Sequence, residues 1–184
     1  MNQCAFCNLH PPIAHSHVVP AFIVRFIKDN SPSGFLLNSW TRKPHFDGYK
    51  GPYLCATCDN VTFSKWENQF KKLAFDPLQA GKGGAWDDPD AIRFLLSVAF
   101  RYGIHFTQTS RTQANSANNL RFTDLTKRAL SNLSLINSQI YIYPYVYRPI
   151  DQTCELLAGV NQFMRLAFFC RAFRASPDYP THFY

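Results

Sequence analysis

The sequence predicts an α+β protein in which a cysteine-rich N-terminal module, residues 1–75, precedes a helix-rich C-terminal part with at least one aromatic strand. Apolar residues recur at spacings of three and four along several stretches, and residues 140–147, IYIYPYVY, alternate aromatic and β-branched side chains. These periods are typical of helices and strands respectively. The N-terminal module carries two C-x-x-C pairs, which are Cys4/Cys7 and Cys55/Cys58.

The composition is that of a folded, basic protein. Its 184 residues are 46% hydrophobic and 17% charged, which excludes wholesale disorder and allows a real core. Lys and Arg exceed Asp and Glu by 19 to 12, which suits a polyanion such as nucleic acid but also serves solubility alone. Because neither a membrane-spanning stretch nor a secretory signal is visible, we expect a cytoplasmic protein with reduced thiols.

The two cysteine pairs predict a structural zinc site. Each C-x-x-C can form a tight turn that directs both sulfurs at one ion, and two such turns complete a tetrahedral Cys4 site formed by Cys4, Cys7, Cys55 and Cys58. Asn8 and Asp59, which follow the pairs, tolerate the tight backbone of these turns. The alternatives are two pairs without metal, or a redox C-x-x-C. Cys154 and Cys170 stand apart among apolar residues and are expected to be buried thiols.

The residues around the cysteines resemble a known family. After the first pair the chain reads Ser16-His17-Val18-Val19-Pro20, and after the second it reads Asp59-Asn60 and continues as a predicted helix. In this order, residues 4–75 resemble the HNH endonuclease family. The resemblance implies a treble-clef, ββα-metal fold for the N-terminal module.

The resemblance also implies cleavage of DNA phosphodiesters. His17 would be the general base that activates water, and a divalent cation, Mg²⁺ or Mn²⁺, would stabilise the leaving oxygen. Asp59 stands where the family places a helical metal ligand, whereas Ser16 replaces the acidic residue that precedes the base. The alternative is a catalytically inactive zinc module that binds nucleic acid or protein. Phage–host conflict is the setting that the resemblance suggests.

The remaining elements follow from local signals in chain order. Pro20 opens a helix over Ala21–Asp29, and short strands are expected within residues 35–54. The helix from 59 to 74 begins at Asp59 as an N-cap or at a capping box, Ser64 to Glu67. Residues 76–90 are expected to form a linker. Asp88 is expected to cap a helix from 89 to about 103 that leaves Arg93 and Arg101 outside the core, and another helix is expected near 119–134. Residues 152–173 fit either a helix or strands.

Basic residues near the module are the candidates for binding double-stranded DNA. The role of the C-terminal part, residues 91–184, stays open, although it could bind a protein partner or associate with itself. His15 and His17 would share a face of a strand, which would let both approach one ion, but we expect no metal role for His15 or His10, and His10 is expected on a surface turn. The candidate DNA-binding residues are Arg25, Lys28, Arg42, Lys43 and Lys65.

Overall fold

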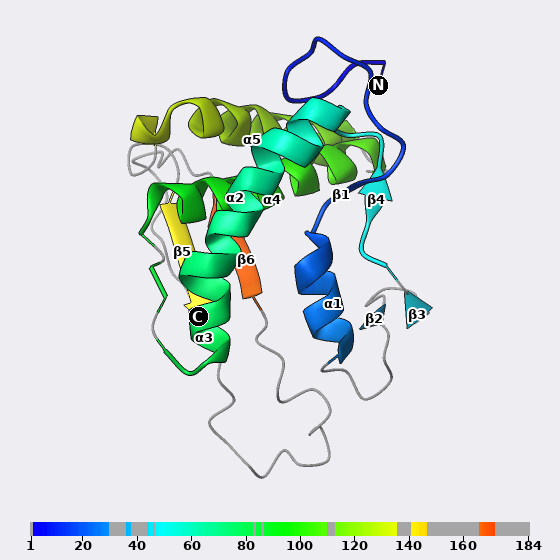
Figure 1. The fold of residues 1–184 in the computed structure, drawn as a ribbon. Coiled ribbons are helices and arrows are strands. Elements are labelled where there is room, and N and C mark those ends of the chain that lie inside the picture. The colour runs from blue at the N-terminus through cyan, green and yellow to red at the C-terminus, as the bar shows by residue number, and fades with distance from the viewer. Residues whose placement is uncertain are drawn as a thin grey trace.

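The structure is a computed structural model, and it describes residues 2–29, 36–37, 44–45, 47–82, 84–85, 87–109, 113–135, 141–146 and 166–171. It is mostly helical with small two-stranded sheets, so the predicted α+β class is confirmed at that level (Figure 1). No described helix has the length and apolar character needed to cross a membrane.

Two short strand pairs and one helix form the N-terminal part. Strand β1 (Ser16–His17) pairs antiparallel with β4 (Lys50–Gly51), so that His17 lies opposite Lys50. Strand β2 (Leu36–Leu37) pairs antiparallel with β3 (Pro44–His45). Helix α1 has the predicted bounds, Ala21–Asp29, and begins directly after Pro20, whose carbonyl accepts a hydrogen bond from the amide of Ile23.

A long helix begins directly after Cys55 and carries Cys58. It consists of a π-helical segment η1 (Cys58–Phe63), helix α2 (Ser64–Phe70), a second π-helical segment η2 (Lys71–Phe75) and helix α3 (Asp76–Gln79), with helical dihedral angles at each junction. The helix predicted for residues 59–74 is therefore confirmed, but both predicted starts are wrong. Thr57 is already helical and Ser64 lies inside the helix, so neither Asp59 nor Ser64 caps it.

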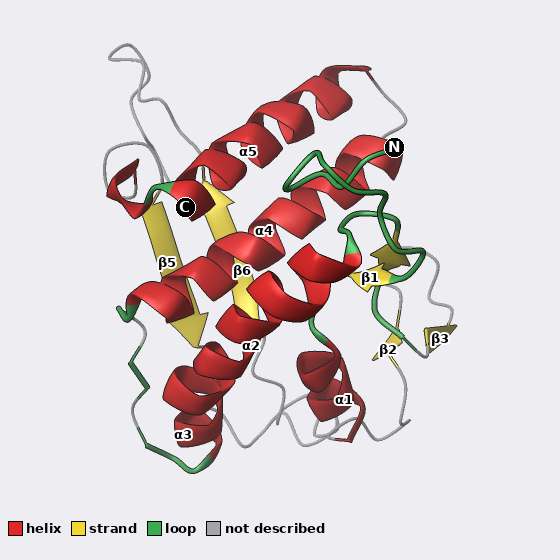
Figure 2. Ribbon diagram, turned by 45° about the horizontal axis from the view of Figure 1, so that its top comes forward, coloured by secondary structure: helices red, strands yellow, loops and turns green. Residues whose placement is uncertain are grey.

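Helix α4 (Pro89–Thr109) lies between α2 and α5 (Gln113–Ser131), and a 3₁₀ turn, η3 (Leu133–Leu135), follows α5 (Figure 2). Asp88 caps α4 as predicted, because its Oδ1 accepts a hydrogen bond from the amide of Asp90 at 2.8 Å. Gly103 allows α4 and α5 to approach closely, since a Cβ at this position would collide with Thr123. The prediction that Arg101 lies outside the core is wrong, because its side chain is 1% exposed.

One hydrophobic core joins the long helix to α4. Phe70 is fully buried and stacks on Phe94, with ring centroids 3.9 Å apart and planes inclined by 18°. Phe63 packs on Phe100 in the same cluster, to which α5 adds Leu130. Residues on both sides of the predicted linker, 76–90, therefore share a core, and part of that segment is helix α3. The division into two domains stays a prediction.

The aromatic segment near the C-terminus forms a strand, as its alternation predicts. Strand β5 (Tyr141–Val146) pairs antiparallel with β6 (Leu166–Arg171), with Tyr141 opposite Arg171. The alternation therefore predicted β5 correctly. For residues 152–173, where the sequence fits either a helix or strands, the described part of the range, residues 166–171, is a strand.

Candidate functional site

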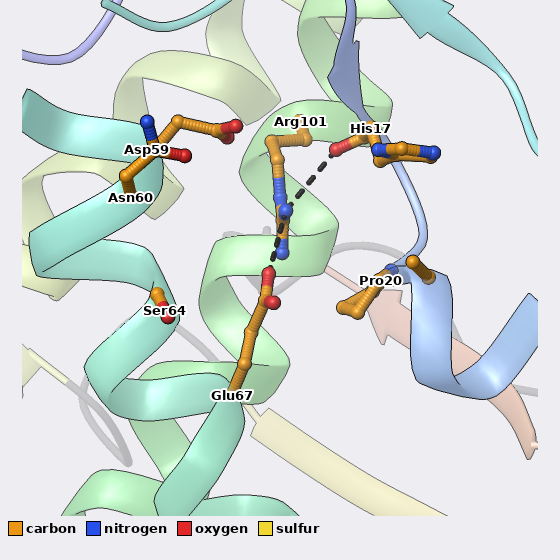
Figure 3. A pocket seen from close by; sticks show the side chains of 8 residues that line it. His17, Pro20, Asp59, Asn60, Ser64, Glu67 and Arg101 are labelled. Atoms are coloured by element: carbon orange, nitrogen blue, oxygen red, sulfur yellow. Dashed lines mark hydrogen bonds and ion pairs between the residues drawn. The ribbon is translucent and has the colours of Figure 1, made fainter. Parts of the chain in front are cut away.

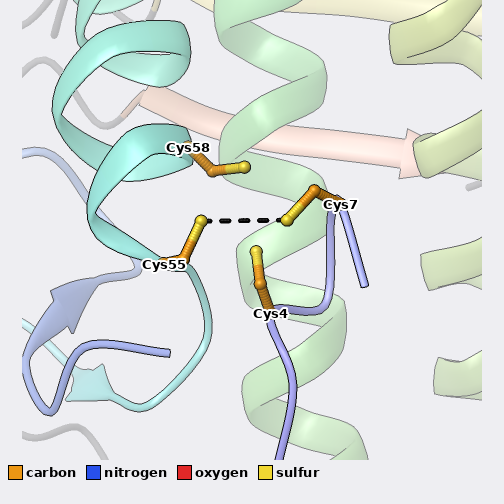
Figure 4. A group of neighbouring side chains, drawn as sticks. All are labelled: Cys4, Cys7, Cys55 and Cys58. Carbon is orange, nitrogen blue, oxygen red and sulfur yellow. Dashed lines mark hydrogen bonds between the residues drawn. The ribbon is translucent and has the colours of Figure 1, made fainter. Parts of the chain in front are cut away.

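Four cysteine thiols converge between the N-terminal loop and the start of the long helix (Figure 4). The Sγ atoms of Cys4, Cys7, Cys55 and Cys58 all lie within 4.8 Å of one another, and those of Cys7 and Cys55 are 3.8 Å apart. Zn–S bonds of about 2.3 Å in a tetrahedron would place the sulfurs about 3.8 Å apart. The four cysteines can therefore hold a metal ion such as zinc. Across the described ranges, no other His, Cys, Asp and Glu side chains form a metal-holding group.

Backbone hydrogen bonds fix the two cysteine turns. The amide of Asn8 donates to the carbonyl of Cys4 at 2.9 Å, and Asn8 has a φ of 58°, in the left-handed region that asparagine tolerates. The amide of Asp59 donates to the carbonyl of Cys55, also at 2.9 Å. Helix α5 contacts the first turn as well, because Lys127 Nζ donates to the carbonyl of Ala5 at 2.8 Å. The thiols are thus held together by contacts from the loop, the long helix and α5.

The thiols differ in how easily they ionise. The amide of Leu9 points at Cys7 Sγ at 3.5 Å, and this contact is the main reason why the pKa of Cys7 is lowered to about 6. Burial, by contrast, raises the pKa of Cys58. The thiolate is the form that binds metal, and a bound cation would favour it at all four cysteines.

A pocket of about 180 Å³ lies where β1, α1, the long helix and α4 meet (Figure 3). Strand β1 and the start of α1 supply one wall, the long helix supplies the opposite wall, and α4 supplies the floor. His17 and Asp59, which the sequence predicts as site residues, both line this pocket, whereas His15 does not and is exposed. The residues that line it are His17, Pro20, Ala21, Asp59, Asn60, Ser64, Glu67 and Arg101.

His17 is held in a half-buried position whose surroundings favour the neutral imidazole. Burial lowers its pKa from the ordinary value, and the positive charges of Lys50 and Arg101 lower it further, while Asp47 and Asp59 act in the opposite direction. A neutral imidazole at pH 7 can accept a proton, which is the property that a general base needs.

Asp59 joins the long helix to strand β1. Its Oδ1 accepts a hydrogen bond of 2.8 Å from Ser16 Oγ, and Ser16 is fully buried. This bond holds the residue before His17 against the helix that carries Cys58. Asp59 belongs to no metal-holding cluster of the described residues, so its role as a ligand of a second metal has no direct geometric support.

Sequence reasoning missed Arg101, the most deeply buried charge in this pocket. Its Nη1 donates to Glu67 Oε1 at 2.9 Å and to the carbonyl of His17 at 3.1 Å. Burial lowers the pKa of Arg101 and raises that of Glu67, and the ion pair between them opposes both shifts. A signal was present in the sequence: Arg101 is the one charged residue in the run from Phe94 to Ile104.

The candidate DNA-binding residues are distributed over several elements. Arg25 on α1 and Lys65 on α2 are exposed, and Lys28 on α1 is half-buried. Arg42 and Lys43 lie outside the described residues. The structure therefore brings His17 and Asp59 into one pocket, and Arg25, Lys28 and Lys65 are not among the residues that line it.

Comparisons with protein-family models, with curated proteins and with solved structures found no match to this chain. The chemistry of the cysteine cluster and of the neighbouring pocket therefore follows from their own residues.

Proposed function

We propose that the protein is a zinc-stabilised, divalent-metal-dependent nuclease that cleaves DNA phosphodiesters, with His17 as the general base. The observation that carries the proposal is the pocket that is lined both by His17, from β1, and by Asp59, which directly follows Cys58 on the long helix. This arrangement agrees with the HNH resemblance of residues 4–75, and the net charge of +7 suits a polyanionic substrate.

In this proposal the four cysteines bind one structural zinc ion. Every ligand is a thiolate, so the metal keeps no open position for a substrate, and its role is to hold the N-terminal loop to the long helix. Zinc bound at such a site contributes directly to the free energy of folding. The treble-clef assignment belongs to the same proposal, because it rests on the resemblance and on the order of the cysteine turns, β1 and the helix.

The catalytic step would be performed by residues of the neighbouring pocket. Neutral His17 would take a proton from the attacking water, and Asn60 and Ser64 would offer hydrogen bonds to the substrate from the face of the long helix. A divalent cation such as Mg²⁺ or Mn²⁺, when bound through Asp59, supplies positive charge to the leaving oxygen. One protein carboxylate can suffice for Mg²⁺, which commonly retains waters and binds substrate phosphates.

A second candidate function is that of a catalytically inactive zinc module that serves as a nucleic-acid- or protein-binding effector. It is favoured by the fact that both carboxylates that line the pocket already have partners, since Asp59 accepts a hydrogen bond from Ser16 and Glu67 pairs with Arg101. In that case the zinc module would be a scaffold, and His17 would be retained for packing.

The test uses the full-length chain, its zinc content and cleavage of supercoiled plasmid with Mg²⁺ or Mn²⁺. We expect one zinc per chain, cleavage by the wild type, and loss of cleavage in His17→Ala with the zinc retained. His15→Ala is the matched control, because His15 is exposed two residues away, and it should cleave normally. For Asp59→Ala, we expect weaker cleavage that additional Mg²⁺ or Mn²⁺ partly restores.

Two outcomes would contradict the proposal. Full cleavage by His17→Ala would place the chemistry elsewhere. A folded, zinc-containing wild type that binds DNA and does not cleave it would establish the effector function instead.

A further inference from the structure

A fully buried arginine reaches the His17 site from a helix outside the residues that resemble the HNH family. Arg101 lies on α4, and its guanidinium uses most of its donors on three residues. Nη1 bonds the carbonyl of His17 and Glu67 Oε1, Nε donates to the carbonyl of Ser97 at 3.2 Å, and Nη2 contacts Ser97 Oγ at 3.3 Å. Figure 3 shows the guanidinium between the His17 carbonyl and Glu67.

The local structure holds this guanidinium in one place. Ser97 Oγ donates to the carbonyl of Phe94 at 2.7 Å, which fixes the hydroxyl that Arg101 contacts one helical turn later. The ring of Phe63 lies beside the guanidinium, with 5.3 Å between its centroid and Arg101 Cζ. Because arginine donors form a rigid planar fork, a guanidinium fixed at several points also fixes the groups that accept its hydrogen bonds.

Stability alone gives a weak account of this ion pair. Removing a guanidinium and a carboxylate from water costs free energy that their attraction often fails to recover, and apolar pairs of similar size commonly stabilise a fold at least as well. The hydrogen bond to His17 offers a different explanation. It fixes the peptide group on the carbonyl side of His17 and therefore the direction in which its side chain leaves the backbone.

We infer that Arg101 is a positioning residue for His17, so that helix α4 completes the site that strand β1 and the long helix begin. The inference rests on the proposed function in so far as His17 is the base. The His17 carbonyl bond at 3.1 Å is the contact on which it depends.

The first experiment separates positioning from simple support of the fold. Arg101→Met should lower the unfolding midpoint, because Glu67, whose side chain is only 23% exposed, then lacks its partner, and Arg101→Met/Glu67→Met should recover most of this decrease. In the double variant the His17 carbonyl still lacks its donor. We therefore expect kcat for plasmid cleavage to fall by about tenfold to a hundredfold while KM changes little. Recovery of kcat together with stability would overturn the inference.

Two further variants complete this experiment. Arg101→Lys keeps a cation beside Glu67 but cannot donate to Glu67, Ser97 and His17 at once, so we expect a folded protein with reduced kcat. This variant decides the matter if the double variant fails to fold, and a wild-type kcat in Arg101→Lys would then overturn the inference. Arg93→Met is the matched control on the same helix, because Arg93 pairs with Asp90, away from the pocket. It should cleave as the wild type does.

The second experiment does not depend on nuclease activity. The imidazole Cε1–Hε1 signal of His17, assigned by its disappearance in His17→Ala, is compared by NMR between the wild type and Arg101→Lys. We expect the His17 signal to shift or split while that of exposed His10 stays in place. A shifted His17 signal in a protein that does not cleave DNA would support positioning and refute the nuclease. An unchanged signal with an unchanged kcat would refute positioning and leave the nuclease intact.

Discussion

Replacement of Phe70 by alanine tests whether the long helix and α4 form one cooperative unit. Phe70 is fully buried and stacks on Phe94, which lies beyond the predicted linker. Truncating a buried phenylalanine costs about 3–5 kcal/mol, because the transfer free energy of the ring is forfeited and a cavity is left behind. We therefore expect Phe70→Ala to lower the free energy of unfolding by about 4 kcal/mol, a large share of the roughly 5–15 kcal/mol of a typical domain.

The stack itself can be measured with a double-mutant cycle. An aromatic pair contributes about 0.5–1.5 kcal/mol beyond its buried area, so Phe70→Ala and Phe94→Ala should be non-additive by about 1 kcal/mol. Urea unfolding followed by circular dichroism gives the free energies, and hydrogen exchange shows whether α2 and α4 become unprotected together. Val61→Ala is the control, because Val61 is on the same long helix and 65% exposed, and its cost should stay within about 0.5 kcal/mol.

The shared core would be refuted by a cost below about 1 kcal/mol for Phe70→Ala, or by α4 keeping its protection while α2 becomes unprotected. Either result would mean that the two segments fold as separate units and that the Phe70–Phe94 stack is a weak interaction between them.

Two further predictions concern pH and salt. Burial lowers the pKa of His105, whose Nδ1 is 2.7 Å from the Tyr53 hydroxyl. The stability that neutral His105 contributes is therefore fully present above the unfolded pKa of about 6.5. It disappears as the pH falls through the lower pKa of the folded state. Urea unfolding between about pH 7 and pH 5 should therefore show a shallower pH dependence in His105→Gln, and an unchanged slope would exclude this histidine as the cause. Charge reversal at exposed Arg25 or Lys65 should weaken DNA binding. It should also reduce the slope of log K against log salt concentration by about 1 for each phosphate that the protein no longer neutralises. A salt titration with an unchanged slope would remove that residue from the interface.

The sequence predicted those features that depend on local spacing. Helix α1 has its predicted bounds, and the long helix buries Phe63 and Phe70, because an apolar stripe at spacings of three and four needs a core to cover it. The convergence of Cys4, Cys7, Cys55 and Cys58 was predictable for a related reason, since the spacing of each pair already defines a turn and a metal ion can join two distant turns.

The features that the sequence did not predict depend on distant partners. A local signal favours Asp59 as a helix cap, whereas the helix begins earlier and Asp59 bonds Ser16, 43 residues away. Arg101 is expected outside the core because a single charge on a helix is usually solvated. Its burial depends on Glu67, 34 residues away, and on the carbonyl of His17, 84 residues away. Spacing along one helix contains no information about such partners.

These distant partners determine how His17 is held. Strand β4 pairs with β1, Asp59 bonds the Ser16 side chain just before His17, and Arg101 bonds the carbonyl of His17 itself. The three constraints come from a strand, from the helix that begins at the cysteine cluster, and from α4. The cysteines can fix the start of the long helix, whereas the donor to the His17 carbonyl comes from α4. A fragment ending at residue 75 would therefore retain the candidate zinc ligands without that donor. In these proposals, metal binding and the orientation of His17 depend on different residues of the chain.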